Sequence, residues 1–128
     1  MPVHVHDRIR KVDRNGIIST VAGSGTTAGF SGDGGPATSA SLNIPVAVAV
    51  DGSGNIYIAE MYHRVRKVDA RGIITTVAGD GKAGFKGDGG PGIAARLNEP
   101  VGLAVTSDGT LFISDWGNQR IRMVVDRR

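Results

Sequence analysis

The sequence predicts an all-β fold made of four-stranded β-propeller blades, and two observations lead to this prediction. The chain repeats itself at intervals of 55 to 56 residues, because Arg8–Asp13 returns as Arg64–Asp69 and Asn55–Glu60 returns as Thr110–Asp115. Each interval holds four short runs rich in β-branched residues, and no stretch keeps a sustained helical period. Four short strands in a repeat of this length are typical of a propeller blade.

The composition agrees with a β protein and excludes several classes of site. Hydrophobic residues make up 40% of the 128 residues but aromatic residues only 5%, so small aliphatic side chains must fill the core. The chain contains no cysteine, which excludes disulfides and cysteine-based metal sites. No apolar run approaches the roughly 20 residues that a membrane helix needs. The net charge of +3 is mildly basic.

The first two strands are predicted to form a tight hairpin. The runs Arg8–Asp13 and Ile17–Ala22 are separated by a short turn that contains Asn15 and Gly16. An Asn-Gly pair between two β-rich runs is a strong hairpin signal, because both residues tolerate a positive φ angle. We name the four strands of a blade a to d from the propeller axis outwards, and these two runs are strands c and d.

The innermost strands are predicted from two apolar runs in which alternate residues are small. Val46–Val50 contains Ala47 and Ala49, and Val101–Val105 contains Gly102 and an alanine. Strands near the axis of a propeller are crowded on both faces, so small buried side chains suit this position. We therefore interpret these runs as the a strands of two successive blades.

The chain as a whole is predicted to be one propeller segment, 1–128. Residues 8–23 supply strands c and d of one blade, 45–79 a full blade, and 100–125 strands a, b and c of another. The glycine-rich stretches 24–44 and 80–99 are the linkers that lead from strand d of one blade to strand a of the next.

The linkers contain motifs that resemble ligand sites, but we interpret them as structural. Gly79–Gly84 matches the spacing of a dinucleotide-binding loop, yet no helix is expected after it to hold a phosphate. Asp33 and Asp88 lie in repeated Gly-Asp-Gly-Gly-Pro turns, where an aspartate that fixes the turn is favoured over a calcium ligand. The predicted structural linker residues are Gly32, Asp33, Gly34, Gly87, Asp88 and Gly89.

Two ion pairs are predicted across the turns between strands b and c. Glu60 precedes one turn and Arg64 follows it, and Asp115 and Arg120 flank the equivalent turn. A carboxylate and a guanidinium that meet there would hold the turn by charge-assisted hydrogen bonds. The alternative is a rim of arginines around one mouth of the propeller.

No metal, cofactor or catalytic site is predicted. His4 and His6 share one face of a strand, and His63 would have to join them to bind zinc, which we do not favour. No serine–histidine–carboxylate set and no pair of acids recurs in a convincing order. We therefore expect a protein that is not an enzyme.

The best candidate for a binding face lies at the b–c turns. Tyr62 and Trp116 occupy these turns, and an exposed aromatic side chain there would serve as a binding anchor. His63, Asn118 and Gln119 complete the candidate face. The alternative is that the aromatic rings pack on the neighbouring linker, as we expect for Phe30 and Phe85.

The repeats resemble the NHL family. Pro100–Arg122 has the pattern Pro-x-Gly-x-Ala-Val followed by Leu-Phe-Ile-Ser-Asp-Trp-Gly-Asn-Gln-Arg-Ile-Arg, and Pro45–Arg66 fits with one residue fewer and with Ala47 in place of the usual glycine. The Thr-Val-Ala-Gly linkers are similar to those of bacterial members. The resemblance implies a β-propeller, usually of six blades, whose relatives are protein- or RNA-binding platforms, sensors or, occasionally, enzymes.

Two blades cannot close a propeller, so the sequence predicts self-association. Three copies would supply six blades in a head-to-tail C3 ring. One blade at each junction would combine strands of two chains, and either 8–13 or 120–124 would supply its c strand. A dimer, a larger ring and an engineered or truncated propeller fragment are the other interpretations.

The predicted function is a non-catalytic scaffold or interaction module that binds itself and a protein, peptide or glycan ligand. The alternative is an RNA-binding platform, by analogy with basic members of the family, although we favour a solvated or internally paired face for the excess positive charge. A propeller lyase or lactonase is the least favoured, because the inward strands carry no histidine or glutamate to hold a metal.

Overall fold

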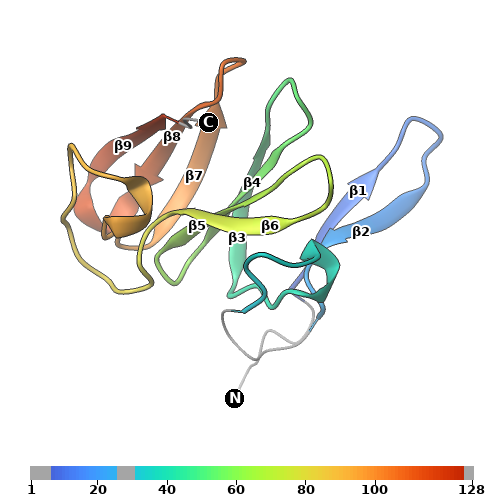
Figure 1. Cartoon of the computed structure of the whole chain (residues 1–128), viewed down its shortest axis with the longest axis horizontal. Coiled ribbons are helices and arrows are strands. Elements are labelled where there is room, and N and C mark those ends of the chain that lie inside the picture. The colour runs from blue at the N-terminus through green and yellow to red at the C-terminus, as the bar shows by residue number, and fades with distance from the viewer. Residues whose placement is uncertain (1–6, 26–30, 126–128) are drawn as a thin grey trace.

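The protein is all-β, as the sequence predicts, with antiparallel sheets of two to four strands (Figure 1). The computed structural model describes residues 7–25 and 31–125, and these residues form nine strands in three sheets. The helical segments among them are the short 3₁₀ turns η1 (Ala37–Ser39), η2 (Gly92–Ala94) and η3 (Trp116–Asn118). Within the described ranges no helix has the length and apolar character needed to cross a membrane.

The middle sheet, which we call the complete blade, has four strands in the order β3-β4-β5-β6. These strands are β3 (Pro45–Val50), β4 (Ile56–Glu60), β5 (Arg64–Val68) and β6 (Ile74–Ala78). Two of the turns, β3–β4 and β5–β6, are fixed by aspartates. In the β3–β4 turn, Asp51 Oδ1 accepts hydrogen bonds from the backbone N–H groups of Ser53 at 2.9 Å and Asn55 at 3.0 Å.

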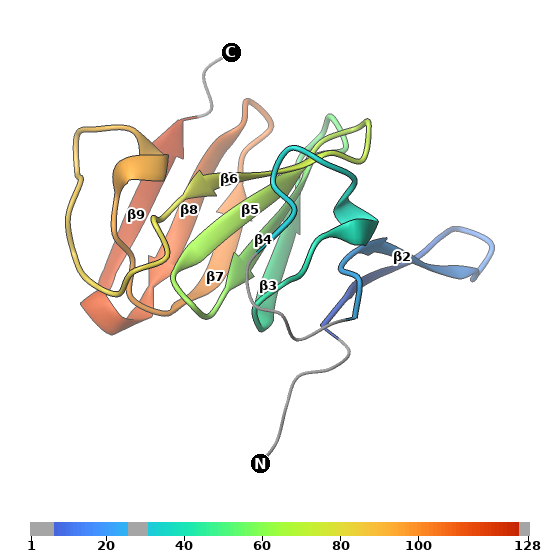
Figure 2. The same ribbon diagram turned by 60° about the horizontal axis from the view of Figure 1, so that its bottom comes forward.

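The other two sheets have fewer strands among the described residues. The amino-terminal hairpin consists of β1 (Ile9–Val12) and β2 (Ile18–Ala22). The open blade has three strands, β7 (Pro100–Val105), β8 (Thr110–Asp115) and β9 (Arg120–Val125), with β9 at its edge. The views in Figures 1 and 2 show the hairpin and the open blade on opposite sides of the complete blade.

Each linker lies between two sheets and contributes to a hydrophobic core. The first core joins the hairpin and the first linker to one face of the complete blade. Its buried members are Ala22, Ala37, Ala40, Leu42, Ile58, Val68 and Ile74. The second core joins the other face of the complete blade to the second linker and the open blade. Its buried members are Tyr57, Val65, Ala78, Leu97, Leu111 and Ile113.

The two outward faces of the described residues are apolar and exposed. On the open blade, Ile121 is 68% exposed, whereas the equivalent Val65 of the complete blade is fully buried against the open blade. On the complete blade, Val48 and Val50 of β3 are exposed on the side of the hairpin, whose two strands do not cover β3. Each exposed row lies where a further blade would pack, so these faces match the buried faces between the two blades.

We predict that Gly79→Ala destabilises the protein more than Gly72→Ala. Both glycines have positive φ angles, +89° and +82°, so alanine is strained at either position, at a cost of roughly 1 to 3 kcal/mol. At Gly79 an added Cβ would also lie 2.2 Å from the carbonyl oxygen of His63, whereas nothing lies within 4 Å of a Cβ at Gly72. Urea denaturation measures both variants, and equal losses in the free energy of unfolding would contradict the structure.

Candidate functional site

A buried arginine joins the first linker to the complete blade. Arg66 lies in the middle of β5 and its side chain is fully buried. Its Nη1 donates to Glu60 Oε2 at 2.9 Å and to the carbonyl of Ser41 at 3.1 Å. Its Nη2 donates to the carbonyl of Ser31 at 2.7 Å, and its Nε donates to Asp33 Oδ1 at 3.1 Å. One guanidinium thus binds the end of β4, at Glu60, and the first linker at Ser31, Asp33 and Ser41.

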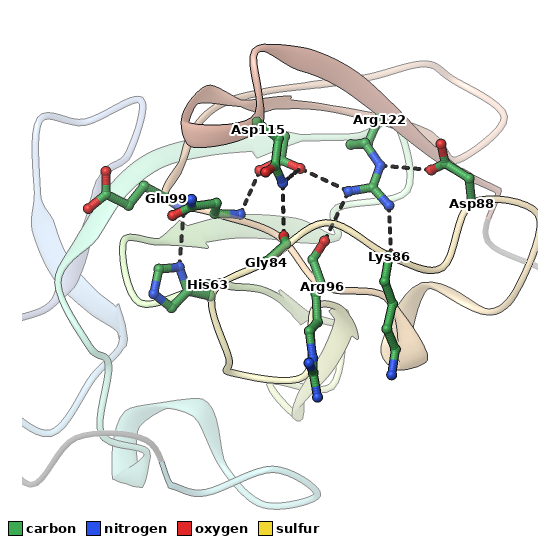
Figure 3. A network of polar contacts seen from close by, with 10 residues as sticks. His63, Gly84, Lys86, Asp88, Arg96, Glu99, Asp115 and Arg122 are labelled. Atoms are coloured by element: carbon green, nitrogen blue, oxygen red, sulfur yellow. Dashed lines mark hydrogen bonds and ion pairs between the residues drawn. The ribbon is translucent and has the colours of Figure 1, made fainter.

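The open blade repeats this arrangement with Arg122 (Figure 3). Its Nη1 donates to Asp115 Oδ2 at 2.8 Å and to the carbonyl of Arg96 at 3.0 Å. Its Nε donates to Asp88 Oδ1 at 2.9 Å, and its Nη2 donates to the carbonyl of Lys86 at 3.0 Å. We call each of these networks an arginine clamp.

Each clamp leaves its buried charges satisfied, and this limits what it can do chemically. Burial raises the pKa of Glu60, and the positive charge of Arg66 and its hydrogen bond act in the opposite direction. A raised carboxyl pKa can mark an acid–base group. Here, however, the carboxylate is buried against the guanidinium and is not open to a substrate. In the described ranges, every buried side-chain nitrogen or oxygen atom has a hydrogen-bond partner.

The partners of the two carboxylates correct the pairs predicted from the sequence. Asp115 was expected to pair with Arg120, but its ion pair is with Arg122. Glu60 was expected to pair with Arg64, but its buried ion pair is with Arg66, while the charge of Arg64 also acts to lower the pKa of Glu60. The reason is the linker. It offers carbonyls and an aspartate to the second arginine of each strand, where one guanidinium can satisfy all of them.

The first arginine of each Arg-x-Arg strand has a different role. Arg64 lies opposite Glu60 in the strand register, and its Nη2 donates to the carbonyl of Asp80 at 3.3 Å. Arg120 lies over the ring of Phe85, with its guanidinium carbon 4.0 Å from the ring centre. The repeated Arg-x-Arg pattern contains a signal for the clamp, because alternate strand residues share a face, but it does not say which arginine the linker covers.

Asp33 and Asp88 connect the linkers to strands. Beyond its bond to Arg66, Asp33 accepts a hydrogen bond from Thr76 Oγ1 at 2.6 Å, so it also holds β6. Asp88 has the same bond to its arginine but is 67% exposed, against 33% for Asp33. The described residues contain no group of three or more metal-ligating side chains, and His4 and His6, like Phe30, lie outside them.

The glycines beside these aspartates allow the linker to approach closely. Gly32 and Gly87 have φ angles of +97° and +100°. A Cβ on Gly32 would lie 2.5 Å from the Cβ of Ala40, and one on Gly87 would lie 2.6 Å from the Cα of Ala95. Gly34 and Gly89 also have positive φ angles but open space around them. The first pair therefore allows close packing, whereas the second pair needs glycine only for its backbone conformation.

The candidate binding face divides into anchored residues and exposed aromatic residues. His63 Nδ1 accepts a hydrogen bond from the backbone N–H of Glu99 at 3.1 Å, which ties this turn to the next blade (Figure 3). Asn118 Nδ2 donates to Asp115 Oδ2 at 2.8 Å. Tyr62 and Trp116 are 49% and 62% exposed.

Gln119 completes the set of residues predicted for this face. It has a left-handed conformation with φ of +54° and follows η3. His63, its equivalent in the complete blade, also has a positive φ angle, +75°. The b–c turns thus share a left-handed residue at the equivalent position.

Two family models match the chain, and together they cover most of it. The model described as Teneurin NHL domain matches residues 26–84, and the model described as NHL repeat matches residues 97–122. Among curated proteins, the chain is 41% identical to the chloroplastic protein SUPPRESSOR OF QUENCHING 1 of Arabidopsis thaliana over 85 residues, which are 65% of this chain and 8% of that protein. It is 39% identical to human Teneurin-4 over 99 residues, which are 66% of this chain and 4% of the teneurin. The chain therefore spans a small part of these relatives.

Solved structures share the fold. A protein of unknown function from Bacteroides thetaiotaomicron superposes with a TM-score of 0.74 and 24% identity, over 94% of this chain and 30% of that one. An auxiliary nutrient binding protein from the same organism gives a TM-score of 0.66 and 23% identity, over 95% of this chain and 33% of that one. The chain thus corresponds to about a third of each of these larger proteins.

We predict that Arg66→Ala is far more destabilising than Arg64→Ala. Removal of Arg66 leaves the carboxylate of Glu60 buried without its partner, which costs about 3 to 5 kcal/mol. Arg64 is partly exposed and donates to the uncharged carbonyl of Asp80, so its removal is expected to cost about 1 kcal/mol. Urea denaturation followed by circular dichroism compares the two. Similar losses would show that the first arginine of the strand matters as much as the second.

Proposed function

Because the chain belongs to the NHL-repeat family, we propose that it is a non-catalytic propeller scaffold that assembles with other copies of itself and presents a ligand-binding face. The family membership rests on the two matching repeat models. The proposal concerns the 128 residues of this sequence, since the relatives are much longer proteins.

The contact between the two blades is the observation that carries the proposal. One face of the complete blade, with Tyr57 and Val65, packs against Leu111 and Ile113 of the open blade. The same two kinds of face are exposed at the outer sides, where Ile121 is the equivalent of Val65. A second copy placed head to tail would cover both outer faces with the packing already present between the blades.

A closed ring is the expected form of such an assembly. Head-to-tail contacts generate rings when the rotation per copy closes and open fibres when it does not. Three copies would give the six blades that the family usually has, so we favour a C3 trimer. Burial of the exposed side chains would supply the driving force, at about 25 cal/mol per Å² of apolar surface. These side chains are Val48, Val50, Ile121 and Met123.

The polar groups that could perform chemistry are used for structure, which supports a non-catalytic role. Glu60 and Asp115 are buried on their arginines, and Asp33 and Asp88 hold the linkers. Metal analysis of the purified protein tests this view. A stoichiometric bound metal would instead favour a propeller lyase or lactonase.

Tyr62 and Trp116 are the proposed anchors of the binding face. Large aromatic side chains that remain exposed on a rigid scaffold are typical of sites that bind proteins, peptides or glycans. An RNA-binding platform has less support, because the arginines of the clamps are buried and cannot reach a phosphate backbone.

We predict that the 128-residue chain sediments at a mass about three times its 13.3 kDa. Ile121→Lys is expected to shift the protein to monomer, because it places a charge on the proposed interface, where Ile121 is exposed in a single copy. Ser107→Lys adds the same charge at an exposed position in the β7–β8 turn and should leave the mass unchanged. A wild-type chain that stays monomeric at tens of micromolar would refute self-assembly.

We also predict that Trp116→Ala and Tyr62→Ala weaken binding to any peptide or glycan that the wild-type chain captures on an array. Loss of one such anchor is expected to cost roughly 2 kcal/mol, or about thirtyfold in affinity. Circular dichroism serves as the control for folding. The RNA-binding alternative would be favoured if the chain captures nothing on the array and binds single-stranded RNA in a salt-dependent way. In that case neither variant should change the affinity for RNA.

A further inference from the structure

We propose that the fourth strand of the open blade is β2 of a second copy, which leaves its own β1 and pairs with β9. Thr20 of that copy would donate a hydrogen bond to Asp88. This inference rests on the proposed self-assembly and specifies which strand is exchanged and in what register.

The open blade has a groove where its fourth strand would lie. β9 is the edge strand of its sheet (Figure 2), and a groove of about 800 Å³ follows it. Its lining includes Asp88 and Pro91 of the second linker, Thr76–Ala78 of β6 and Met123–Val125 of β9. In the complete blade, β6 occupies the corresponding position beside β5.

The backbone of the second linker offers hydrogen-bonding groups to this groove. In the complete blade, the first linker and β6 are joined by three backbone bonds: Gly34 N–H to Ile74 C=O, Ile74 N–H to Gly35 C=O and Ala37 N–H to Gly72 C=O, at 2.7, 3.1 and 2.8 Å. The equivalent groups of the second linker are the N–H of Gly89, the C=O of Gly90 and the N–H of Gly92. Among the described residues, none of them has a backbone partner of this kind.

Asp88 lacks the second contact that its counterpart has. Asp33 holds both an arginine of β5 and the hydroxyl of Thr76 in β6. Asp88 holds Arg122, and no hydroxyl group among the described residues reaches it. A strand that fills the groove in the same register would therefore place a threonine at Asp88.

β2 has the side chains that this register requires. Thr20 and Ile18 lie 56 residues before Thr76 and Ile74. Within the hairpin Thr20 faces Arg10, as Thr76 faces Arg66 in the complete blade. Ile18 is 53% exposed in the hairpin, whereas Ile74 is fully buried, so transfer into the groove would bury it.

The structure indicates that β1, rather than β9, is released. Arg122 fixes β9 through its clamp, whereas Arg10 of β1 is exposed and forms no ion pair within the described part of the chain. Lys67 is buried in β5 of the complete blade. The residue at the same position is Met123 in β9 and Lys11 in β1. Burying Met123 and leaving Lys11 in water is the favourable choice.

The ends of the exchanged segment also have matching partners. In the hairpin, Arg8 donates to the carbonyl of Ser24 at 3.1 Å, as Arg64 donates to the carbonyl of Asp80. Arg120 stands at the equivalent position of the open blade. After the exchange, Arg120 of one copy would replace Arg8 at Ser24 of the next.

Cysteine pairs test which strand holds β2, since the chain has no native cysteine. The register of Lys67 opposite Thr75 places Met123 of one copy opposite Ser19 of the next, whereas Lys11 faces Ser19 within the hairpin. We expect Ser19→Cys with Met123→Cys to form disulfides between chains under mild oxidation at concentrations where the protein is assembled. We expect Lys11→Cys with Ser19→Cys to form its disulfide only in dissociated chains.

The outcomes separate this inference from the proposed assembly. A ladder of disulfide-linked multimers from the Ser19/Met123 pair, with each single-cysteine variant as control, supports the strand exchange. An assembled protein in which only the Lys11/Ser19 pair reacts, within each chain, overturns the exchange but leaves self-assembly intact. A protein that remains monomeric and reacts only within the hairpin overturns both.

A threonine pair tests the contact with Asp88. Thr20→Val is expected to raise the dissociation constant of the assembly by about tenfold or more, because it removes a hydrogen bond to a carboxylate. Thr76→Val removes the equivalent bond inside one chain, so it should lower the melting temperature but change the dissociation constant by less than about threefold. An unchanged dissociation constant for Thr20→Val would refute the contact.

Discussion

The fold depends on burying one arginine per blade beneath a glycine-rich linker. The guanidinium gathers a carboxylate from the strand, an aspartate from the linker and two linker carbonyls, and with these partners its charge can be buried. The clamp holds the linker against the strand, and the linker in turn supplies Leu42 and Leu97 to the two cores between sheets. Polar and apolar contacts together therefore place each linker between its two sheets.

This use of charge also shapes what the protein can do. The repeated acids of the b–c turns, Glu60 and Asp115, and their partners Arg66 and Arg122 are turned inwards, where they serve stability. The groups left for recognition are the aromatic residues of the b–c turns and the apolar outer faces. The proposed assembly and the proposed binding face use these aromatic and apolar groups.

The repeat also makes its own asymmetries informative. Two repeats of the same sequence are expected to make the same contacts. A contact that is present in one repeat and absent from the other therefore shows where their surroundings differ. Asp33 and Asp88 differ in this way, as do Val65 and Ile121. Asp88 lies in the second linker beside β9 and Ile121 lies in β9 itself, so the proposed second copy would cover both.

The sequence by itself determined the repeat family, the all-β class and the strands of each blade, because these follow from short-range signals: alternation, turn residues and a constant interval. The tertiary structure alone decided the partners of the charged residues. The buried ion pair of Glu60 is with Arg66, and Asp33 holds Thr76 across 43 residues of chain. Both arginines of the pattern lie on one face of the strand, so local periodicity cannot choose between them. The choice depends on where the linker crosses that face, which is fixed only when the sheets pack.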